Sequence, residues 1–333
     1  MTTTQPGPIR MGLIGLGSMG RHHARVIRAT QGVELVAVAD PAGDVHGVAG
    51  ELEVLADVEA LIAAGIDAAM VAVPTVYHEQ VGLALAAAGV HTMIEKPIAH
   101  TVEAGRRVAA AFAEAGLVGA VGYVERCNPA ILELRRRLAA GELGQVYQIQ
   151  TRRQGPFPAR ISDVGVVKDL ATHDVDLTAF IAGSPYRQVA AQVTHRSGRE
   201  HEDMVLATGI LESGVIVNHV VNWLSPMKER STVVTGERGA FVADTMSGDL
   251  TFYANGTVPT TWDRVAHFRG VTEGDVLRYA LPKREPLAVE QENFRDAVQG
   301  KASDIVTMDQ GVHTLTVIEA ILEAADTGST VTL

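Results

Sequence analysis

The stretch IRMGLIGLGSMGRHHARVI, residues 9–27, decides the fold of the first part of the chain. It joins an apolar run to an amphipathic segment through the pattern Gly15-x-Gly17-x-x-Gly20. The first glycine suits a tight turn, the second lets a pyrophosphate approach the backbone, and the third allows close packing of helix on strand. The amino terminus of the following helix adds free N–H groups and a positive dipole end. The pattern predicts a β-α unit that binds a dinucleotide.

Asp40 follows Gly20 at the end of a second apolar run. An acid at this place hydrogen-bonds a ribose 2′-hydroxyl and repels a 2′-phosphate, so Asp40 favours NAD over NADP. The alternative is that Asp40 only starts a turn. We expect His22 and His23 to be surface or structural residues, because positive charge at a helix amino terminus opposes the dipole. The predicted cofactor contacts are Gly15, Leu16, Gly17, Ser18, Met19, Gly20, Asp40, Pro74, Thr75, His78, Glu95 and Lys96.

The alternation of apolar runs and amphipathic stretches predicts two domains. Buried strands that alternate with helices indicate an α/β, doubly wound parallel sheet of the Rossmann type for residues 1–122. Period-2 runs separated by turn signals indicate an α+β domain for residues 123–333, with a mostly antiparallel open sheet flanked by helices. The predicted strands are 9–14, 33–39, 68–73, 90–94, 117–121, 145–153, 187–196, 204–211, 214–222, 231–235, 239–243 and 249–253. The predicted helices are 19–30, 57–64, 77–88, 101–115, 129–140, 286–299 and 308–326.

The composition excludes several classes of protein. With 28 Lys+Arg against 39 Asp+Glu the formal charge is −11, so there is no global basic field for a nucleic-acid backbone. The single cysteine, Cys127, excludes an intramolecular disulfide and fits a reducing compartment. The first residues lack the apolar core of a signal peptide, and the apolar runs are too short to cross a bilayer. We therefore expect a cytoplasmic protein without nucleic-acid or membrane partners.

Glu95-Lys96-Pro97 follows the buried run 90–94. Proline restricts the residue before it to extended geometry, which fixes Lys96 at the carboxyl edge of the sheet, where open α/β folds bind ligands. A lysine there can stabilise negative charge on a reacting oxygen. The alternative is a solvated charge pair with Glu95.

The segment KDLATHDVDL, residues 168–177, gathers acids around one histidine. At 100° per residue, Asp169, His173 and Asp176 share a helix edge, while Asp174 points away. A metal site is one alternative, but no second histidine completes a ligand set, so we expect no metal; an inert polar face is the other. Because hydride loss from an alcohol also requires loss of the hydroxyl proton, His173 is the expected base, oriented or assisted by Asp169.

Arg152, Arg153 and Arg160 flank a Gly-Pro-Phe-Pro turn shortly before this segment. Their forked donors suit a diphosphate, for which an acidic protein needs a local cationic site; ordinary surface arginines are the alternative. Tyr123 and Asn128 are candidates to line the cleft between the domains. The predicted substrate contacts are Lys96, Tyr123, Asn128, Arg152, Arg160, Asp169 and His173.

The order of these motifs resembles the glucose–fructose oxidoreductase/inositol dehydrogenase/MocA (Gfo/Idh/MocA) family across nearly the whole chain. The resemblance implies that Lys96 contacts the substrate hydroxyl and helps to place the nicotinamide, and that the Lys96–Pro97 bond is often cis. It also implies that the family's Asp-x-x-x-His pair falls on Asp169 and His173. Residues 122–131 and 152–177 look most like the UDP-N-acetylglucosamine 3-dehydrogenase group.

The leading hypothesis is therefore an NAD-dependent sugar dehydrogenase that oxidises a ring secondary hydroxyl, such as C3 of UDP-N-acetylglucosamine or a related nucleotide sugar. The alternatives are an inositol or other cyclitol dehydrogenase, a deoxysugar ketoreductase of secondary metabolism, and a non-catalytic dinucleotide-sensing protein. A sensor need not keep Lys96, Asp169 and His173 together. The open sheet of the second domain predicts a homodimer or homotetramer formed by face packing.

Overall fold

The computed structural model describes residues 7–158, 164–256 and 272–333. The chain divides into two compact units: Met1–Val124 with Glu285–Leu315, and Glu125–Arg284 with Thr316–Leu333. The predicted boundary after residue 122 lies close to the first division. The sequence assigned all residues from 123 onward to the second domain, whereas the structure groups 285–315 with the first unit. The physical reason is that Phe294 and Val298 belong to the core around the first helix of the chain.

The first unit is built on a parallel sheet with the strand order β3-β2-β1-β4-β5-β6. Its strands are β1 (Ile9–Ile14), β2 (Val33–Ala39), β3 (Val54–Leu55), β4 (Ala68–Val71), β5 (His91–Glu95) and β6 (Gly119–Gly122). Most of their residues are buried, as expected for a sheet that helices cover on both faces. The predicted doubly wound parallel sheet is confirmed.

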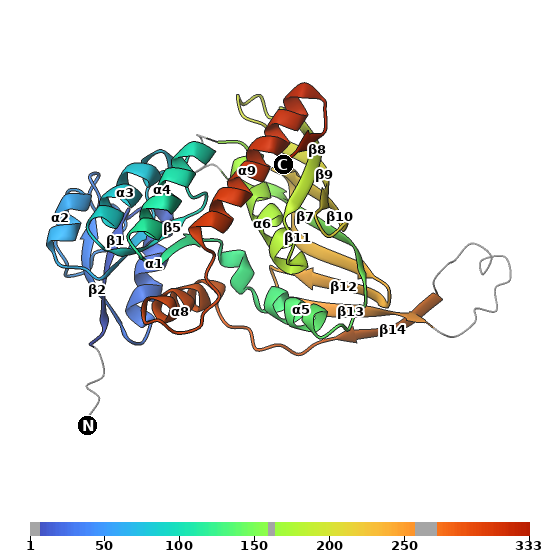
Figure 1. Cartoon of the computed structure of the whole chain (residues 1–333), viewed down its shortest axis with the longest axis horizontal. Coiled ribbons are helices and arrows are strands. Elements are labelled where there is room, and N and C mark those ends of the chain that lie inside the picture. The colour runs from blue at the N-terminus through green and yellow to red at the C-terminus, as the bar shows by residue number, and fades with distance from the viewer. Residues whose placement is uncertain (1–6, 159–163, 257–271) are drawn as a thin grey trace. The chain divides into compact units, whose positions relative to one another are not determined.

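Two separate cores fill the faces of this sheet. One core contains residues of α2 (Val58–Ala63), α3 (His78–Ala87) and α4 (Val102–Glu114), together with residues at the start of α9 (Met308–Thr327). The other contains residues of α1 (Ser18–Ala29) and α8 (Pro286–Val298). Figure 1 shows α8 beside α1, although more than 250 residues separate them in the sequence. Helix α8 thus completes the α1 side of the Rossmann sheet, although it follows the whole second sheet except β15 in the sequence.

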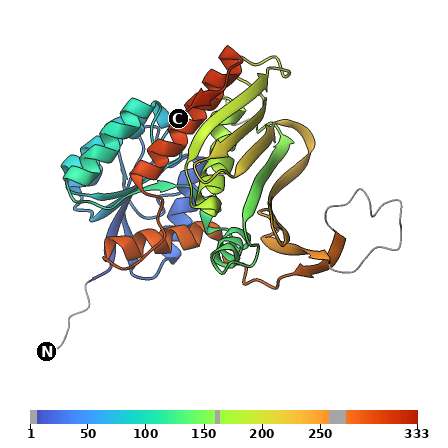
Figure 2. The ribbon, with the colours of Figure 1, turned by 45° about the vertical axis from the view of Figure 1, so that its right-hand side comes forward.

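The second unit holds a nine-stranded sheet with the order β14-β13-β12-β11-β7-β10-β9-β8-β15, seen from two angles in Figure 1 and Figure 2. All of its strand pairs are antiparallel except β10 with β7. The strands are β7 (Val146–Pro156), β8 (Tyr186–Thr194), β9 (Met204–Leu211), β10 (Ile216–Asn222), β11 (Leu224–Gly236), β12 (Gly239–Asp244), β13 (Asp249–Gly256), β14 (Thr272–Arg278) and β15 (Val331–Thr332). The predicted mostly antiparallel sheet is confirmed.

Helices cover one face of this sheet, which we call the inner face. They are α5 (Pro129–Ala139), α6 (Thr172–Ala182) and the second half of α9, and their apolar residues join those of the strands in one core. The opposite, outer face carries residues such as Leu206 and Ile216, which are about half exposed. Among the residues described, we find no helix that is both long and apolar enough to cross a membrane.

Candidate active site

The glycine-rich loop lies where the strand order reverses, between β1 and β4. Gly15 has φ +93°, and a Cβ atom there would overlap the backbone of Ala72 just after β4. A Cβ on Gly20 would overlap the carbonyl oxygen of Gly15, whereas a Cβ on Gly17 would meet nothing within 4 Å. Two of the glycines are therefore required by packing, and the third leaves open space at a switch point, where doubly wound sheets bind nucleotides.

The amino terminus of α1 fits a dinucleotide phosphate. Gly17 is the residue before the helix, no side chain caps the first turn, and no acid lies in it. Backbone N–H groups and the positive end of the helix dipole thus face the open side of Gly17. Ser18 is exposed and Met19 half-buried beside it, whereas Leu16 is buried. The residues present fit the pyrophosphate of NAD.

Asp40 follows β2 and shapes the same loop. Its Oδ2 accepts a hydrogen bond from the backbone N–H of Leu16 at 2.8 Å, and its Oδ1 accepts one from that of Ala42 at 2.8 Å. The side chain is only partly buried. Because each carboxylate oxygen has two lone pairs, Asp40 can brace the loop and still accept a ribose hydroxyl.

Pro74 and Thr75 follow β4. Because β4 runs parallel to β1, they lie at the same carboxyl edge of the sheet as the glycine-rich loop. His78, at the start of α3, is buried instead, with its Nδ1 2.8 Å from the carbonyl oxygen of Pro97 and its Nε2 3.0 Å from that of Val73. Burial lowers the pKa of His78 despite these two carbonyls. His78 thus connects the turn after β5 to the loop after β4 through hydrogen bonds. A direct contact of His78 with the cofactor stays a prediction.

Lys96 lies at the carboxyl end of β5, in a turn that contains a cis Lys96–Pro97 peptide bond, as the family resemblance implies. Its backbone N–H donates to Oε2 of Glu95 at 3.1 Å, and its side chain is partly exposed. Lys96 is therefore at the edge of the sheet that carries the glycine-rich loop and Asp40.

Asp169 and His173 lie one turn apart in the second unit, but the segment is not the regular helix that the sequence predicts. Residues Val167–Ala171 form a π-helical turn, and α6 begins only at Thr172. Such wider turns inside helices occur frequently at functional sites. Asp169 is buried and His173 half-buried.

Glu202, which the sequence analysis missed, caps this π-helical turn. Its Oε1 accepts from the backbone N–H of Val167 at 2.9 Å, and its own carbonyl oxygen accepts from Val166 at 3.0 Å. A Cβ on Gly165 would overlap the Glu202 carboxylate. A carboxylate at a helix amino terminus is stabilising, so Glu202 helps to fix the position of the Asp169–His173 segment.

The other two acids of the segment are bound by buried arginines. Both carboxylate oxygens of Asp176 accept from Arg126, at 2.7 and 2.6 Å, and Arg126 also lies over the ring of Phe180. Asp174 accepts from Arg153 at 2.9 Å, and burial raises the pKa of Asp174. Both carboxylate oxygens of Asp176 are thus bound to Arg126, which weakens the metal alternative.

The predicted arginine group is divided by the alternation of β7. Arg153 points to the inner face, where it donates to Glu125 at 2.8 Å as well as to Asp174. Arg152 is exposed and shares the outer face with Gln148 and Gln150. The structure thus does not bring Arg152 together with His173, whose helix covers the inner face. Arg160 lies outside the described residues.

Tyr123 and Asn128 are both buried. Asn128 caps α5: its Oδ1 accepts from the backbone N–H of Ala130 at 3.0 Å, and its Nδ2 donates to the carbonyl oxygen of Thr245 at 2.8 Å. The structure therefore gives Asn128 a structural task, and substrate contact by either residue stays a prediction.

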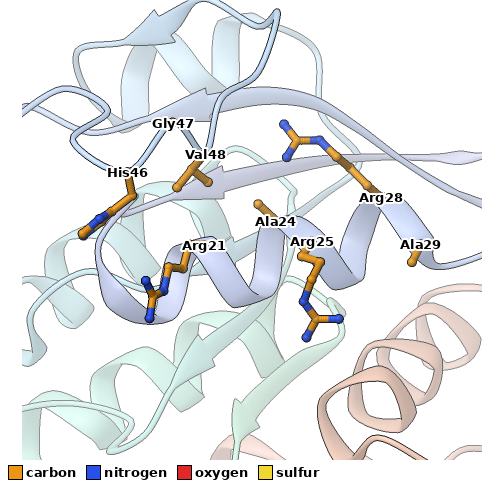
Figure 3. Close-up of a pocket in the computed structure, with 8 residues that line it drawn as sticks. All are labelled: Arg21, Ala24, Arg25, Arg28, Ala29, His46, Gly47 and Val48. Carbon is orange, nitrogen blue, oxygen red and sulfur yellow. The ribbon is translucent and has the colours of Figure 1, made fainter.

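A groove of about 530 Å³ on the first unit contains none of the predicted site residues. Figure 3 shows Arg21, Arg25 and Arg28 on one side of α1, with His46 on the facing loop. Arg25 pairs with Glu285, and Arg28 donates to the carbonyl oxygen of Ala49 at 2.8 Å. Two of the three guanidinium groups thus anchor neighbouring segments. In the part of the chain that the structure describes, no cluster of three or more His, Cys, Asp or Glu side chains could hold a metal ion.

Comparisons with known proteins agree with this geometry. Residues 9–123 match the model of an oxidoreductase family with an NAD-binding Rossmann fold, and residues 131–242 match the Gfo/Idh/MocA carboxy-terminal domain. UDP-N-acetylglucosamine 3-dehydrogenase of Acidithiobacillus ferrooxidans is 32% identical over 87% of this chain and 88% of its own. A solved structure of that enzyme has a TM-score of 0.81, with 28% identity over 96% of this chain and 98% of the other. The NAD(+)-dependent scyllo-inositol 2-dehydrogenase of Bacillus subtilis is 31% identical over 55% of this chain and 56% of its own.

Proposed function

Because this chain belongs to the Gfo/Idh/MocA family of oxidoreductases, we propose that it is an NAD-dependent dehydrogenase that oxidises C3 of UDP-N-acetylglucosamine or of a related nucleotide sugar. The observation that carries the substrate class is the 32% identity to a UDP-N-acetylglucosamine 3-dehydrogenase over 87% of the chain. The scyllo-inositol dehydrogenase aligns over only 55%. That relative supports a cyclitol as the second candidate substrate.

In the proposed reaction His173, Asp169 and Lys96 each have a different role. NAD, when bound, supplies the acceptor for the hydride. His173 accepts the proton of the substrate hydroxyl at a ring nitrogen, and the buried carboxylate of Asp169, one turn earlier, orients or assists the ring. The ammonium group of Lys96 stabilises the negative charge that develops on the same oxygen. In the reverse direction these groups reduce a ketone.

An assay of NADH formation with a panel of nucleotide sugars and cyclitols tests this proposal. We expect turnover with UDP-N-acetylglucosamine or a close analogue, and a much lower kcat/KM with inositols. Higher turnover with an inositol would favour the second candidate. Tight NAD binding without turnover of any sugar or polyol would instead favour a dinucleotide-sensing protein and contradict the proposal.

Asp40 is expected to set the preference for NAD. Replacing Asp40 with alanine removes a charged hydrogen-bond acceptor, a contribution of about 1.5–3 kcal/mol, and also removes the repulsion of a 2′-phosphate. The ratio of kcat/KM for NAD to that for NADP should therefore fall by at least about tenfold. Asp44→Ala is the matched control, because Asp44 accepts from Val48 and Ala49 in the same loop. An equal change in both variants would mean that Asp40 acts only through the shape of the loop after β2, and not through the ribose hydroxyl.

The outer face of the second sheet is the proposed site of homodimer formation. Leu206 pairs with Val220, and Ile216 with Ile210, on neighbouring strands of that face. Exposed apolar side chains gathered on a sheet face indicate an association surface. We expect Ile216→Asp to lower the molar mass measured by light scattering from dimer, or tetramer, toward monomer. Met246→Asp, at an equally exposed turn, should leave it unchanged, and a monomeric native chain would refute the proposal. The single cysteine, Cys127, is buried and has no second cysteine with which to form an intramolecular disulfide, which suits the proposed cytoplasmic location.

A further inference from the structure

A buried chain of hydrogen bonds, which the reaction above does not use, supports the strand end that carries Lys96. Oε1 of Glu95 lies 2.7 Å from Nε2 of His23, and Nε2 of Gln291 lies 3.2 Å from Nδ1 of the same ring. His23 and Gln291 are both buried. The three side chains come from β5, α1 and α8, so the chain of bonds joins segments that are far apart in the sequence.

The direction of these bonds follows from the groups involved. The amide nitrogen of Gln291 can only donate, so Nδ1 of His23 is the acceptor and the ring proton lies on Nε2. His23 then donates that proton to Glu95. The second carboxylate oxygen of Glu95 accepts from the backbone N–H of Lys96 at 3.1 Å. One carboxylate thus connects His23 to the turn that presents Lys96.

The charge on Glu95 depends on its neighbours. Burial alone would raise the pKa of Glu95, but the hydrogen bond from His23 and the positive charge of Lys96 hold it below its usual value. His78 from α3 also interacts electrostatically with Glu95, and burial lowers the pKa of His78. An ionised carboxylate is the stronger hydrogen-bond acceptor, so loss of the His23 donor should leave Glu95 protonated at higher pH and weaken its bond to the Lys96 turn.

We propose that His23 is a positioning residue for the dehydrogenase reaction, which acts through Glu95 to fix Lys96 against the substrate oxygen, with Gln291 holding the histidine ring. The inference rests on the proposed function, because it assumes that Lys96 contacts that oxygen. It explains why a polar histidine occupies a buried position of α1, where an apolar residue would pack at lower cost.

Infrared spectroscopy of the protonated carboxyl group tests the first link without substrate. At pH 6 we expect His23→Leu to show a carboxylic-acid band that is absent from the native chain and from the double variant His23→Leu/Glu95→Gln. His91→Leu is the matched control, because His91 is a partly buried histidine at the start of β5 whose Nδ1 accepts from Val118 at 2.9 Å. It should show no such band. If His23→Leu does not fold, His23→Phe, which keeps a planar ring but has no N–H donor, takes its place. A folded variant without the band would overturn the inference.

Kinetics test the second link. In His23→Leu we expect kcat to fall about tenfold at pH 6, through misplacement of Lys96, and to recover toward the native value at pH 9. KM for NAD should change less than twofold, and His23→Gln, which keeps a donor near the Nε2 position, should behave like the native enzyme. A native pH profile in His23→Leu would refute the positioning role. If the native chain turns over no substrate, the proposed function fails while the infrared measurement still decides the coupling of His23 to Glu95.

Discussion

Replacing His173 with alanine is expected to lower kcat by about 10²–10⁴-fold, the usual contribution of a positioned acid–base group. His173 lies half-buried at the start of α6, one turn after the buried Asp169, and Glu202 holds the π-helical turn before it. Without the imidazole the substrate hydroxyl loses its proposed base, so hydride transfer would have to proceed from the neutral alcohol. The measurement is kcat for NADH formation at saturating substrate.

The effect should be confined to the chemical step. The proposed cofactor residues belong to the other unit, so the dissociation constant for NAD, measured by fluorescence, should change less than twofold. His195→Ala is the matched control, because His195 is an exposed histidine directly after β8. Its kcat should remain within twofold of the native value. Native activity in His173→Ala would contradict the assignment, and an equal loss in His195→Ala would show that the effect is not specific.

Those strands and helices whose apolar pattern is local could be predicted from the sequence. The runs 9–14, 33–39 and 204–211 form strands with the predicted bounds. The first two are nearly continuous apolar runs, as in strands that are buried on both faces. The third alternates buried and more exposed residues, as in a strand that is covered on one face. The strand Thr272–Arg278 was missed because most of its residues are exposed, which leaves no apolar alternation to detect.

The site could be predicted only where a short motif carries it. The spacing of Gly15, Gly17 and Gly20 is enough to identify the loop that they form. The hydrogen bond between His23 and Glu95, in contrast, joins residues 72 positions apart, and no local pattern indicates it. The face of Arg153 could have been predicted from the spacing along the strand. Arg153 lies four residues after the apolar Ile149 and so shares its face, which is fully buried, whereas Arg152 lies two residues after Gln150 on the opposite face. The π-helical turn could not, because it depends on Glu202, which comes from a distant loop.

A second large effect is expected on stability in acid, from a buried histidine away from the proposed chemistry. His219 on β10 lies 2.7 Å from Oγ1 of Thr151 and 2.8 Å from the hydroxyl of Tyr186. Burial lowers the pKa of His219 to about 4 from 6.5. The unfolded chain therefore binds a proton on His219 between these pH values and the folded chain does not, so this stabilisation is complete above pH 6.5 and is lost as the pH falls toward 4. The loss corresponds to about 3 kcal/mol.

Urea unfolding between pH 8 and pH 4.5 measures this loss when native chain and His219→Gln are compared. At pH 8 the variant should be the less stable, because it loses packing and hydrogen bonds. As the pH falls below 6.5, the free energy of unfolding of the native chain should decrease by up to about 1.4 kcal/mol per pH unit more than that of the variant, because glutamine does not titrate. The gap between the two should therefore narrow or reverse by pH 4.5. His195→Gln, at an exposed site, should keep the native slope. Parallel slopes for the native chain and His219→Gln would mean that His219 takes up its proton in the folded state, which its burial between Thr151 and Tyr186 opposes.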